Sequence, residues 1–365
     1  MRSDAPAEHA TRPGATGPRF CVSGPRLPRR PSGYRRPVEL ALVCPGCRTR
    51  TADRLDLRTL EPDGAAGDVL ACACGRRYPV VDGVPIVMAD PAGYLRTEIA
   101  SVVERDLTPV VIALLVAGGP DDAPYPRLAE HLSIYLDAHW GDRAEPAGPG
   151  FALAAVADRL ARLDPVATAV ELGCSAGRIV GELAARADRV AGLDLHFGAV
   201  RRARRLLDGE RVAYPRRMIG RRYAAAAARA GDRAVPAARR LLVCGDALDP
   251  PFVPGAFDRV VALNLIDSVA SPGQLLAVLD GLCAPGGELI VSSPYAWQSS
   301  VMAEAERLGG ADPAAELTAR LTGGTDLSAR YRIEDEAELP WALRRDARST
   351  VSYEIHYVRA RKLAS

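Results

Sequence analysis

The sequence predicts an α/β protein with a mainly parallel sheet covered by helices on both faces, preceded by a small cysteine-bearing unit. Two patterns carry this prediction. Short apolar segments alternate with helical patterns after residue 151, which is typical of βαβ units. Two close cysteine pairs lie between residues 44 and 74. The length of 365 residues favours two or three domains. Hydrophobic and charged shares of 48% and 25% exclude a largely disordered chain and a polytopic membrane protein.

Four segments follow one another along the chain. Residues 1–37 hold seven prolines and eight arginines with almost no apolar periodicity, so we expect a disordered basic arm. No apolar stretch of a signal peptide follows the N-terminus, and we expect a cytoplasmic protein without a membrane anchor. Residues 38–90 form the cysteine-bearing unit and residues 91–150 a helical linker. Residues 151–365 form the sheet domain.

The strands and helices of the sheet domain follow from hydrophobic periodicity. The C-terminal segment Val351–Arg359 alternates with period two, as a half-exposed antiparallel strand does. The other expected strands are Ala167–Leu172, Arg189–Leu195, Leu241–Cys244, Phe257–Leu263 and Glu288–Ser292, and the helices are Gly177–Ala187, Gly198–Leu207 and Pro272–Cys283.

The two cysteine pairs have the spacing of a metal site. Cys44 and Cys47 form a CxxC pair, and Cys72 and Cys74 form a CxC pair about 25 residues later. Four thiolates can bind one tetrahedral Zn²⁺, and a site closed by four protein ligands is structural rather than catalytic. Four unrelated thiols are the alternative. The following residues 78–85, YPVVDGVP, make the unit similar to the Trm112-like zinc ribbons, a family of small methyltransferase partners.

A glycine-containing turn connects the first expected strand to its helix. The turn has the motif ExGxxxG, formed by Glu171, Gly173 and Gly177, rather than the GxGxxG motif of dinucleotide-binding enzymes. Glycine lets the backbone approach a ligand, and the helix N-terminus favours polar groups. Asp194 and Asp246 follow the next two strands. A carboxylate after the second strand can accept both hydroxyls of a ribose.

This pattern over residues 151–365 resembles the class I S-adenosylmethionine-dependent methyltransferases. The resemblance implies a Rossmann-like α/β fold with a seven-stranded methyltransferase sheet, here with a small N-terminal zinc-ribbon domain. It also implies that S-adenosylmethionine is the cofactor, that Asp194 binds its ribose and that Asp246 binds its adenine. The full set of implied cofactor residues is Glu171, Gly173, Cys174, Gly177, Asp194, Asp246, Ala247 and Asn264.

The acceptor pocket is expected at the ends of the fourth and fifth strands. Asn264, Asp267 and Tyr295 are the candidate catalytic residues there. With Trp297 and the segment Leu339–Trp341, they resemble the mercaptohistidine methyltransferases related to ovothiol synthases. That resemblance implies an imidazole-containing amino acid as the acceptor, with Asp267 binding or deprotonating the imidazole and Tyr295 and Trp297 walling the pocket. Arg344 or Arg348 would meet its carboxylate. Core packing is the alternative role for the two aromatic residues.

The sequence is also compatible with other acceptors and functions. A small-molecule substrate is the first expectation, and tRNA or a translation factor is the alternative by analogy with partners of Trm112-like proteins. A non-catalytic scaffold for a partner methyltransferase is the third.

Residues 201–240 hold 13 arginines against three acidic residues and form an insertion, with Ala224–Ala228 expected to be helical. A solvated helix face is favoured over a clamp for an anionic substrate.

Overall fold

The computed structural model describes residues 40–48, 57–64, 67–116, 124–141, 152–309, 311–323 and 327–364. The predicted disordered arm at residues 1–37 lies outside these ranges. Within them, no helix is both long enough and apolar enough to cross a membrane.

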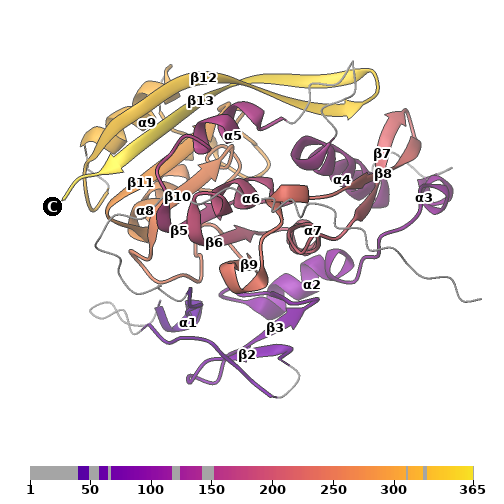
Figure 1. Cartoon of the computed structure of the whole chain (residues 1–365), viewed down its shortest axis with the longest axis horizontal. Coiled ribbons are helices and arrows are strands. Elements are labelled where there is room, and N and C mark those ends of the chain that lie inside the picture. Colours follow the sequence, from indigo (N-terminus) through magenta and orange to yellow (C-terminus); the bar gives the residue numbers. More distant parts are fainter. Residues whose placement is uncertain are drawn as a thin grey trace, which may run out of the picture. The chain divides into compact units, whose positions relative to one another are not determined.

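A seven-stranded sheet forms the centre of the described chain (Figure 1). Its strand order is β12-β13-β11-β10-β5-β6-β9. The five strands from β9 to β11 pair in parallel, while β13 is antiparallel to β11 and β12 is antiparallel to β13. This confirms the predicted Rossmann-like sheet. The strands are β5 (Val166–Leu172), β6 (Ala187–Asp194), β9 (Arg240–Cys244), β10 (Phe257–Leu263), β11 (Cys283–Ser293), β12 (Tyr331–Asp346) and β13 (Ser349–Lys362).

Helices cover both faces of the sheet because successive strand residues point to opposite sides. Ala169 packs into one buried cluster, and its neighbour Val170 packs into the other. The first cluster holds residues of α5 (Ala154–Leu160), α6 (Arg178–Ala184) and α7 (Phe197–Leu207). The second holds residues of α8 (Pro272–Leu282) and α9 (Pro313–Gly323).

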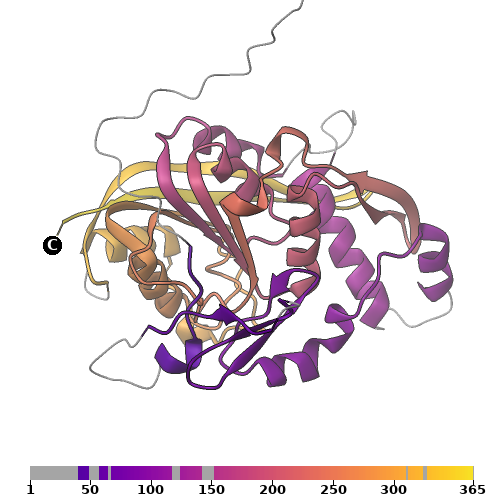
Figure 2. The ribbon, with the colours of Figure 1, turned by 60° about the horizontal axis from the view of Figure 1, so that its bottom comes forward.

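The cysteine-bearing unit is a four-stranded sheet of order β1-β2-β3-β4 that joins the edge of the central sheet. Ile86 forms a parallel bridge with Cys244 of β9, and the Val87 N–H donates to the Cys244 carbonyl at 2.9 Å. The edge of β9 is therefore covered, as both views of the ribbon show (Figures 1 and 2). Its elements are α1 (Pro45–Arg48), β1 (Glu61–Pro62), β2 (Val69–Ala71), β3 (Arg77–Val81) and β4 (Val84–Pro85).

The segment expected to be a helical linker contains α2 (Pro91–Val102), α3 (Pro109–Val116) and α4 (Pro124–Trp140). The last of these helices packs on the main domain. The Trp140 indole N–H donates to the Ala176 carbonyl at 2.8 Å, in the turn after β5. Helix α4 therefore contributes directly to the surroundings of that turn.

The arginine-rich segment differs from the expected helical insertion. After α7 it forms a hairpin of β7 (Val212–Ile219) and β8 (Arg222–Ala228), so the alanine run is a strand. Ala224 to Ala228 pair in register with β7, from Arg216 to Val212. Cross-strand hydrogen bonding and packing on the neighbouring helices override the high helix propensity of alanine.

Candidate functional site

A cavity of about 600 Å³ lies at the carboxyl ends of β5, β6 and β10. Glu171, Asp194 and Asn264 line it from these three strands, and Asp246 lines it from the loop after β9. This is the edge at which open α/β sheets bind ligands. The sequence-predicted residues Gly173 and Ala247 also line the cavity, whereas Cys174 and Gly177 do not.

The turn after β5 depends on glycine at two positions. Gly173 and Gly177 have φ of +76° and +77°, in the left-handed region that favours glycine. A Cβ on Gly177 would lie 2.7 Å from the Cβ of Ala203 on α7. Gly177 therefore supports the close packing of this turn on α7, and Cys174 lies fully buried within the turn.

Two backbone groups hold the Asp194 carboxylate at the cavity wall. The Ser175 N–H donates to Oδ2 at 2.8 Å, and the His196 N–H donates to Oδ1 at 2.9 Å. Each oxygen retains a second lone pair, so the carboxylate can still accept hydroxyl hydrogen bonds. The exposed Asp246 accepts from the Leu248 N–H at 2.8 Å, which fixes it at the rim.

Glu171 is a buried carboxylic acid facing the same cavity. It is 2% exposed, and its Oε2 has no hydrogen-bond partner among the described residues. Burial, with the nearby Asp194 charge, raises the pKa of Glu171 well above its ordinary value. A buried unpaired oxygen of this kind fits a ligand that brings a donor or a positive charge. Glu171 and Asp194 together fit a ligand with ribose hydroxyls and a cationic group, as S-adenosylmethionine has.

The three predicted catalytic residues do not gather around the cavity. Asn264, with φ of +52°, lines it and accepts from the Ser292 hydroxyl at 2.9 Å. Asp267 and Tyr295 are not among the lining residues. The Asp267 carboxylate accepts from the Ala296 N–H at 2.9 Å, and the Tyr295 hydroxyl lies 2.8 Å from His356 Nδ1. These bonds connect the loops after β10 and β11 and the strand β13.

Residues from distant parts of the chain form the remaining wall. Neither Arg344 nor Arg348 lines the cavity, and Arg344 lies 3.8 Å from the Asp137 carboxylate. Among the described residues, the lining contains no arginine and no lysine. Besides Glu171, Asp194, Asp246 and Asn264, its polar and aromatic members are His131, Tyr135, His139, Ser175, His196, Ser268, Gln298 and Trp341.

Sequence reasoning did not assign the histidines to the site. His131 and His139 are far in the sequence from the residues at the strand ends, whereas His196 lies two residues after Asp194. One pattern does point to α4, because His131, Tyr135 and Ala138 are spaced as residues of one helix face and all line the cavity. Burial lowers the pKa of His139 to about 3, with Arg178 adding to the effect. His139 Nδ1 accepts from the Arg178 N–H at 3.4 Å.

The four predicted metal ligands come together in the N-terminal unit. The Sγ atoms of Cys44, Cys47, Cys72 and Cys74 all lie within 4.8 Å of one another. Cys44 and Cys74 are 3.9 Å apart, and Cys47 and Cys72 are 3.6 Å apart. Four sulfurs at about 2.3 Å from a tetrahedral ion would be about 3.8 Å apart, so the cluster fits such an ion. The buried Tyr78 places its hydroxyl 3.1 Å from Cys44 Sγ.

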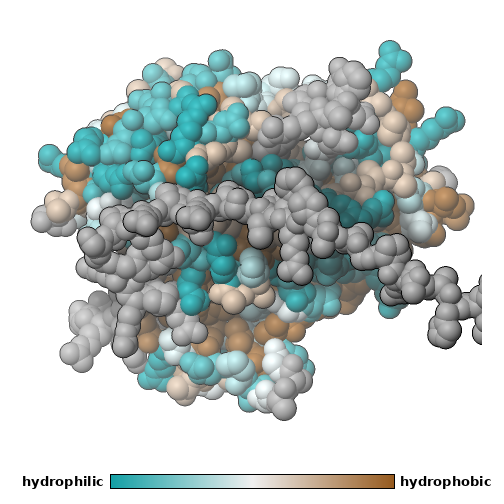
Figure 3. Space-filling model, viewed as in Figure 1, coloured by the Kyte–Doolittle hydropathy of each residue, from teal (hydrophilic) through white to brown (hydrophobic). Residues whose placement is uncertain are grey.

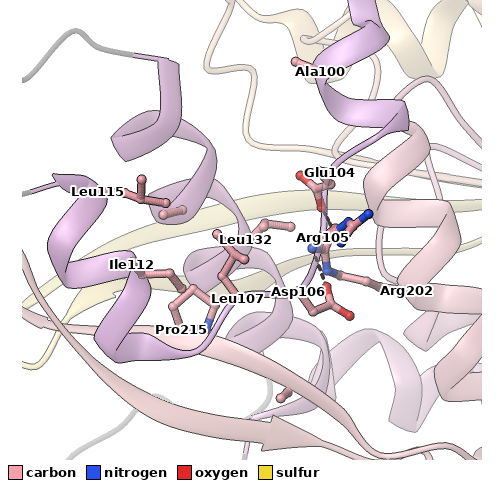
Figure 4. A pocket seen from close by; sticks show the side chains of 12 residues that line it. Ala100, Glu104, Arg105, Asp106, Leu107, Ile112, Leu115, Leu132, Arg202 and Pro215 are labelled. Carbon is pink, nitrogen blue, oxygen red and sulfur yellow. Dashed lines mark hydrogen bonds and ion pairs between the residues drawn. The ribbon is translucent and has the colours of Figure 1, made fainter.

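Two arginines of α7 form a charged network away from the main cavity. Arg202 pairs with Glu104 and with Asp106, the latter at 2.8 Å (Figure 4). Arg205 also pairs with Asp106, at 2.5 Å. This network borders a second cavity of about 410 Å³. Apolar residues of α3 and α4 line its other side. These arginines neutralise the α2–α3 connection rather than line the main cavity.

Helix α3 exposes apolar side chains on its outer face. Val110 and Leu114 are each 72% exposed, and Leu115 is half exposed. Hydrophobic surface is visible at the right-hand edge of Figure 3, where Figure 1 places α3. The described residues show no partner for this face.

Comparison with known proteins agrees with this site. Residues 170–291 match the family model described as "Methyltransferase domain". No curated protein matches the chain. The chain is similar to the solved [4+2]-cyclase SpnF at 15% identity, covering 71% of this chain and 98% of that one, with a TM-score of 0.43. It is also similar to the N-methyltransferase NodS from Bradyrhizobium japonicum at 16% identity, covering 60% and 94%, with a TM-score of 0.37.

The matched residues contain most of the cavity wall from the central strands. They begin one residue before Glu171 and include Asp194, Asp246 and Asn264. Residues 170–291 therefore match a methyltransferase domain on a Rossmann-like sheet of seven strands.

Proposed function

We propose that this protein transfers the methyl group of S-adenosylmethionine to a small acceptor held in the 600 Å³ cavity. The observation that carries the proposal is the convergence of Glu171, Asp194 and Asp246 on one cavity that has a separate neutral wall. Asp194 binds the ribose, Asp246 binds the adenine, and Glu171 receives the cationic end of the methionine part. Asn264 lines the same cavity.

The neutral wall favours a small acceptor over RNA. Tyr135 and Trp341 contribute aromatic surface, while Gln298 and Ser268 contribute hydrogen-bonding groups. No described arginine or lysine lines the cavity to bind a phosphate. An imidazole-containing amino acid is one candidate of this class. Its carboxylate would accept hydrogen bonds from backbone N–H groups or neutral side chains, because no described arginine or lysine lines the cavity. A tRNA or translation-factor acceptor is the alternative, and its support is the Trm112-like sequence of the N-terminal unit.

The reaction requires alignment more than strong catalysis. The cofactor supplies a methyl group on a positively charged sulfur, which is a good leaving group. The chain binds the ribose at Asp194, places the acceptor between α4 and β12, and excludes water with Tyr135 and Trp341. Holding the reactants in line in this way can contribute much of the rate enhancement.

The four-cysteine cluster is proposed to bind a structural Zn²⁺. Its support is the ligand set of four thiolates at tetrahedral spacing, closed to further ligands. The unit is proposed to act in cis, because Val87 and Ile86 already cover the edge strand β9. A non-catalytic scaffold would not need the acidic residues in the cavity, which favours the enzymatic proposal.

Calorimetry tests the cofactor part of the proposal. S-adenosylmethionine and S-adenosylhomocysteine are expected to bind the zinc-quantified wild type with micromolar affinity. The Asp194→Ala variant is expected to lose about 100-fold or more, since hydrogen bonds to a charged group are each worth about 1.5–3 kcal/mol. Glu354→Ala, an exposed change on β13, is the matched control. Absence of binding to the folded wild type would refute the proposal and leave the scaffold function.

Radiolabelled methyl transfer tests the acceptor. Imidazole-containing amino acids and other small neutral metabolites are tried first, followed by tRNA and protein extracts. Label in a small molecule supports the proposal. Label that appears only in RNA or protein would replace the small acceptor by the alternative.

A further inference from the structure

Two described histidines, His139 and His356, have a bonded ring nitrogen, whereas no described group bonds the ring nitrogens of His196 or His131. His196 is exposed, and His131 is the less exposed of the two. His131 lies on α4 and lines the main cavity. Its ring packs against the ring of Tyr135, with centroids 4.5 Å apart, and against that of His196 at 5.3 Å. No described group hydrogen-bonds either of its ring nitrogens. By contrast, both ring nitrogens of His356 are occupied, by Tyr295 and Glu336 at 2.8 Å each.

The ring of His131 is neutral at physiological pH. Burial lowers the pKa of His131 to about 4, and the neighbouring His196 adds to this effect. A neutral imidazole always presents one ring nitrogen as an acceptor. Since nothing in the described chain occupies that nitrogen, a molecule in the cavity can donate to it.

The charged groups around α4 leave the cavity side of His131 without a fixed cation. Asp194 and Glu171 face the same cavity from β6 and β5. On the other sides of α4, two arginines of β7 and two of β12 pair with acidic residues of the helix. These pairs are Asp137 with Arg216 and Arg344, and Glu130 with Arg217 and Arg345.

We propose that His131 is the general base of methyl transfer and that the acceptor is a protic nucleophile whose proton must leave. Such acceptors carry a hydroxyl, a thiol or an imidazole N–H. This inference rests on the proposed function of the cavity. It excludes acceptors such as tertiary amines, which have no proton to lose.

The proposed step balances in atoms and charge. The acceptor X–H bond breaks and its proton goes to the free ring nitrogen of His131. The X–C bond forms, the C–S bond breaks, and its electron pair stays on sulfur. The positive charge of the sulfonium thus passes to the imidazolium. Before the transfer the sulfonium keeps His131 neutral by repulsion, and afterwards that repulsion is gone.

Nuclear magnetic resonance on the full-length protein with ¹³C-labelled histidine tests this geometry without a known acceptor. The two probes are S-adenosylmethionine and S-adenosylhomocysteine, which differ in charge only by the sulfonium. If His131 faces the reacting centre, its pKa in the S-adenosylmethionine complex should be lower by about 1 to 2, as expected for one charge at about 6 Å. The signal of His356, outside the cavity, should not change.

Variants complete the test. His131→Gln assigns the signal and is expected to retain S-adenosylhomocysteine affinity within about twofold, because a base contributes to the reaction and not to cofactor binding. His196→Gln is the matched control and should leave the response of His131 to the sulfonium in place. An equal pKa of His131 in the two complexes, or a pKa above 7 with S-adenosylhomocysteine, would overturn the proposal.

The outcomes separate this inference from the proposed function. If neither probe binds the wild type, both the cofactor assignment and the proposed role of His131 as general base are refuted. If both bind and His131 does not respond to the sulfonium, only the general base is refuted. A loss of more than tenfold in affinity in His131→Gln would make His131 a binding residue instead.

Discussion

The backbone N–H of Ser175 donates a 2.8 Å hydrogen bond to the carboxylate of Asp194. Ser175 lies in the turn after β5 with φ of +44°, and Asp194 is the last residue of β6. The bond therefore connects the ends of two neighbouring strands. It positions the carboxylate before any ligand binds, which reduces the ordering cost of binding.

Replacing Asp194 by Asn should disturb this connection. The N–H groups of Ser175 and His196 bond different oxygens of the carboxylate, so an amide in the same position presents its NH2 group to one of them. We expect a loss of about 1–3 kcal/mol in the free energy of unfolding, from one part-buried donor left unpaired. Urea denaturation measures this loss. A stability equal to that of the Glu354→Gln control would contradict the expectation.

Gly177→Ala should destabilise the protein. The residue has φ of +77°, and the new methyl group would lie 2.7 Å from the Cβ of Ala203. Strain and overpacking together should cost about 2–4 kcal/mol. The matched change is Gly281→Ala in α8, where nothing lies within 4 Å of the new Cβ, and this should be neutral or stabilising by up to about 1 kcal/mol. Thermal melts of both variants compare the two sites, and similar shifts in Tm would disprove the argument.

The raised pKa of Glu171 predicts how stability depends on pH. The native state keeps the proton at a pH where the unfolded chain, with its ordinary pKa near 4.5, has lost it. The contribution of Glu171 to stability is therefore fully present below pH 4.5 and falls as the pH rises toward its native pKa. Glu171→Gln removes this dependence. Urea unfolding at pH 5 and pH 8 should show the wild type losing stability relative to the variant, and a constant difference would refute the prediction.

Cofactor binding should release a proton from the same group. A positively charged ligand next to Glu171 favours its ionised form and lowers its pKa. Calorimetry at pH 6 in two buffers of different ionisation enthalpy measures the released protons. We expect release by the wild type and less by Glu171→Gln. Equal release by both would place the proton on another group.

Metal removal should destabilise the sheet domain as well as the cysteine unit. Cys44, Cys47 and Tyr78 share a buried cluster with Val243 of β9 and Phe252. Stripping the metal with a chelator should lower Tm by several degrees, because binding free energy at such sites is folding free energy. The control is Cys47→Ser, on which the chelator should have little further effect. An unchanged wild-type Tm after confirmed zinc loss would argue against this coupling.

Deleting residues 38–90 should expose the edge strand. Val87 donates to Cys244, and Val43 donates to Pro251, both at 2.9 Å. Without these contacts, β9 presents unpaired backbone groups and its apolar neighbours to solvent. We expect a lower Tm or lower activity of the remaining protein, measured by thermal melts and cofactor binding. Full stability and turnover of the shortened protein would refute this.

The central sheet could be predicted because its strands are short, apolar and separated by regular helices. Phe257–Leu263 was predicted with the bounds that the structure has, and the ExGxxxG turn falls between β5 and α6. The hairpin β7–β8 could not be predicted in this way. Its alanines have helix propensity, and only their pairing with β7 makes them a strand.

The sequence by itself determined the sheet edge at which the cavity lies, and it predicted the four cysteines that come together. Asp194 and Asp246 follow strands, and parallel strands must end at one edge of their sheet. The tertiary structure alone decided the rest of the cavity wall, which is proposed to hold the acceptor. It placed His131 and Trp341, 210 positions apart, on one cavity, and directed Asp267 and Tyr295 to partners in neighbouring loops and in β13. Spacing in a sequence determines which residues share an element, whereas packing between elements determines which side chains face the same cavity.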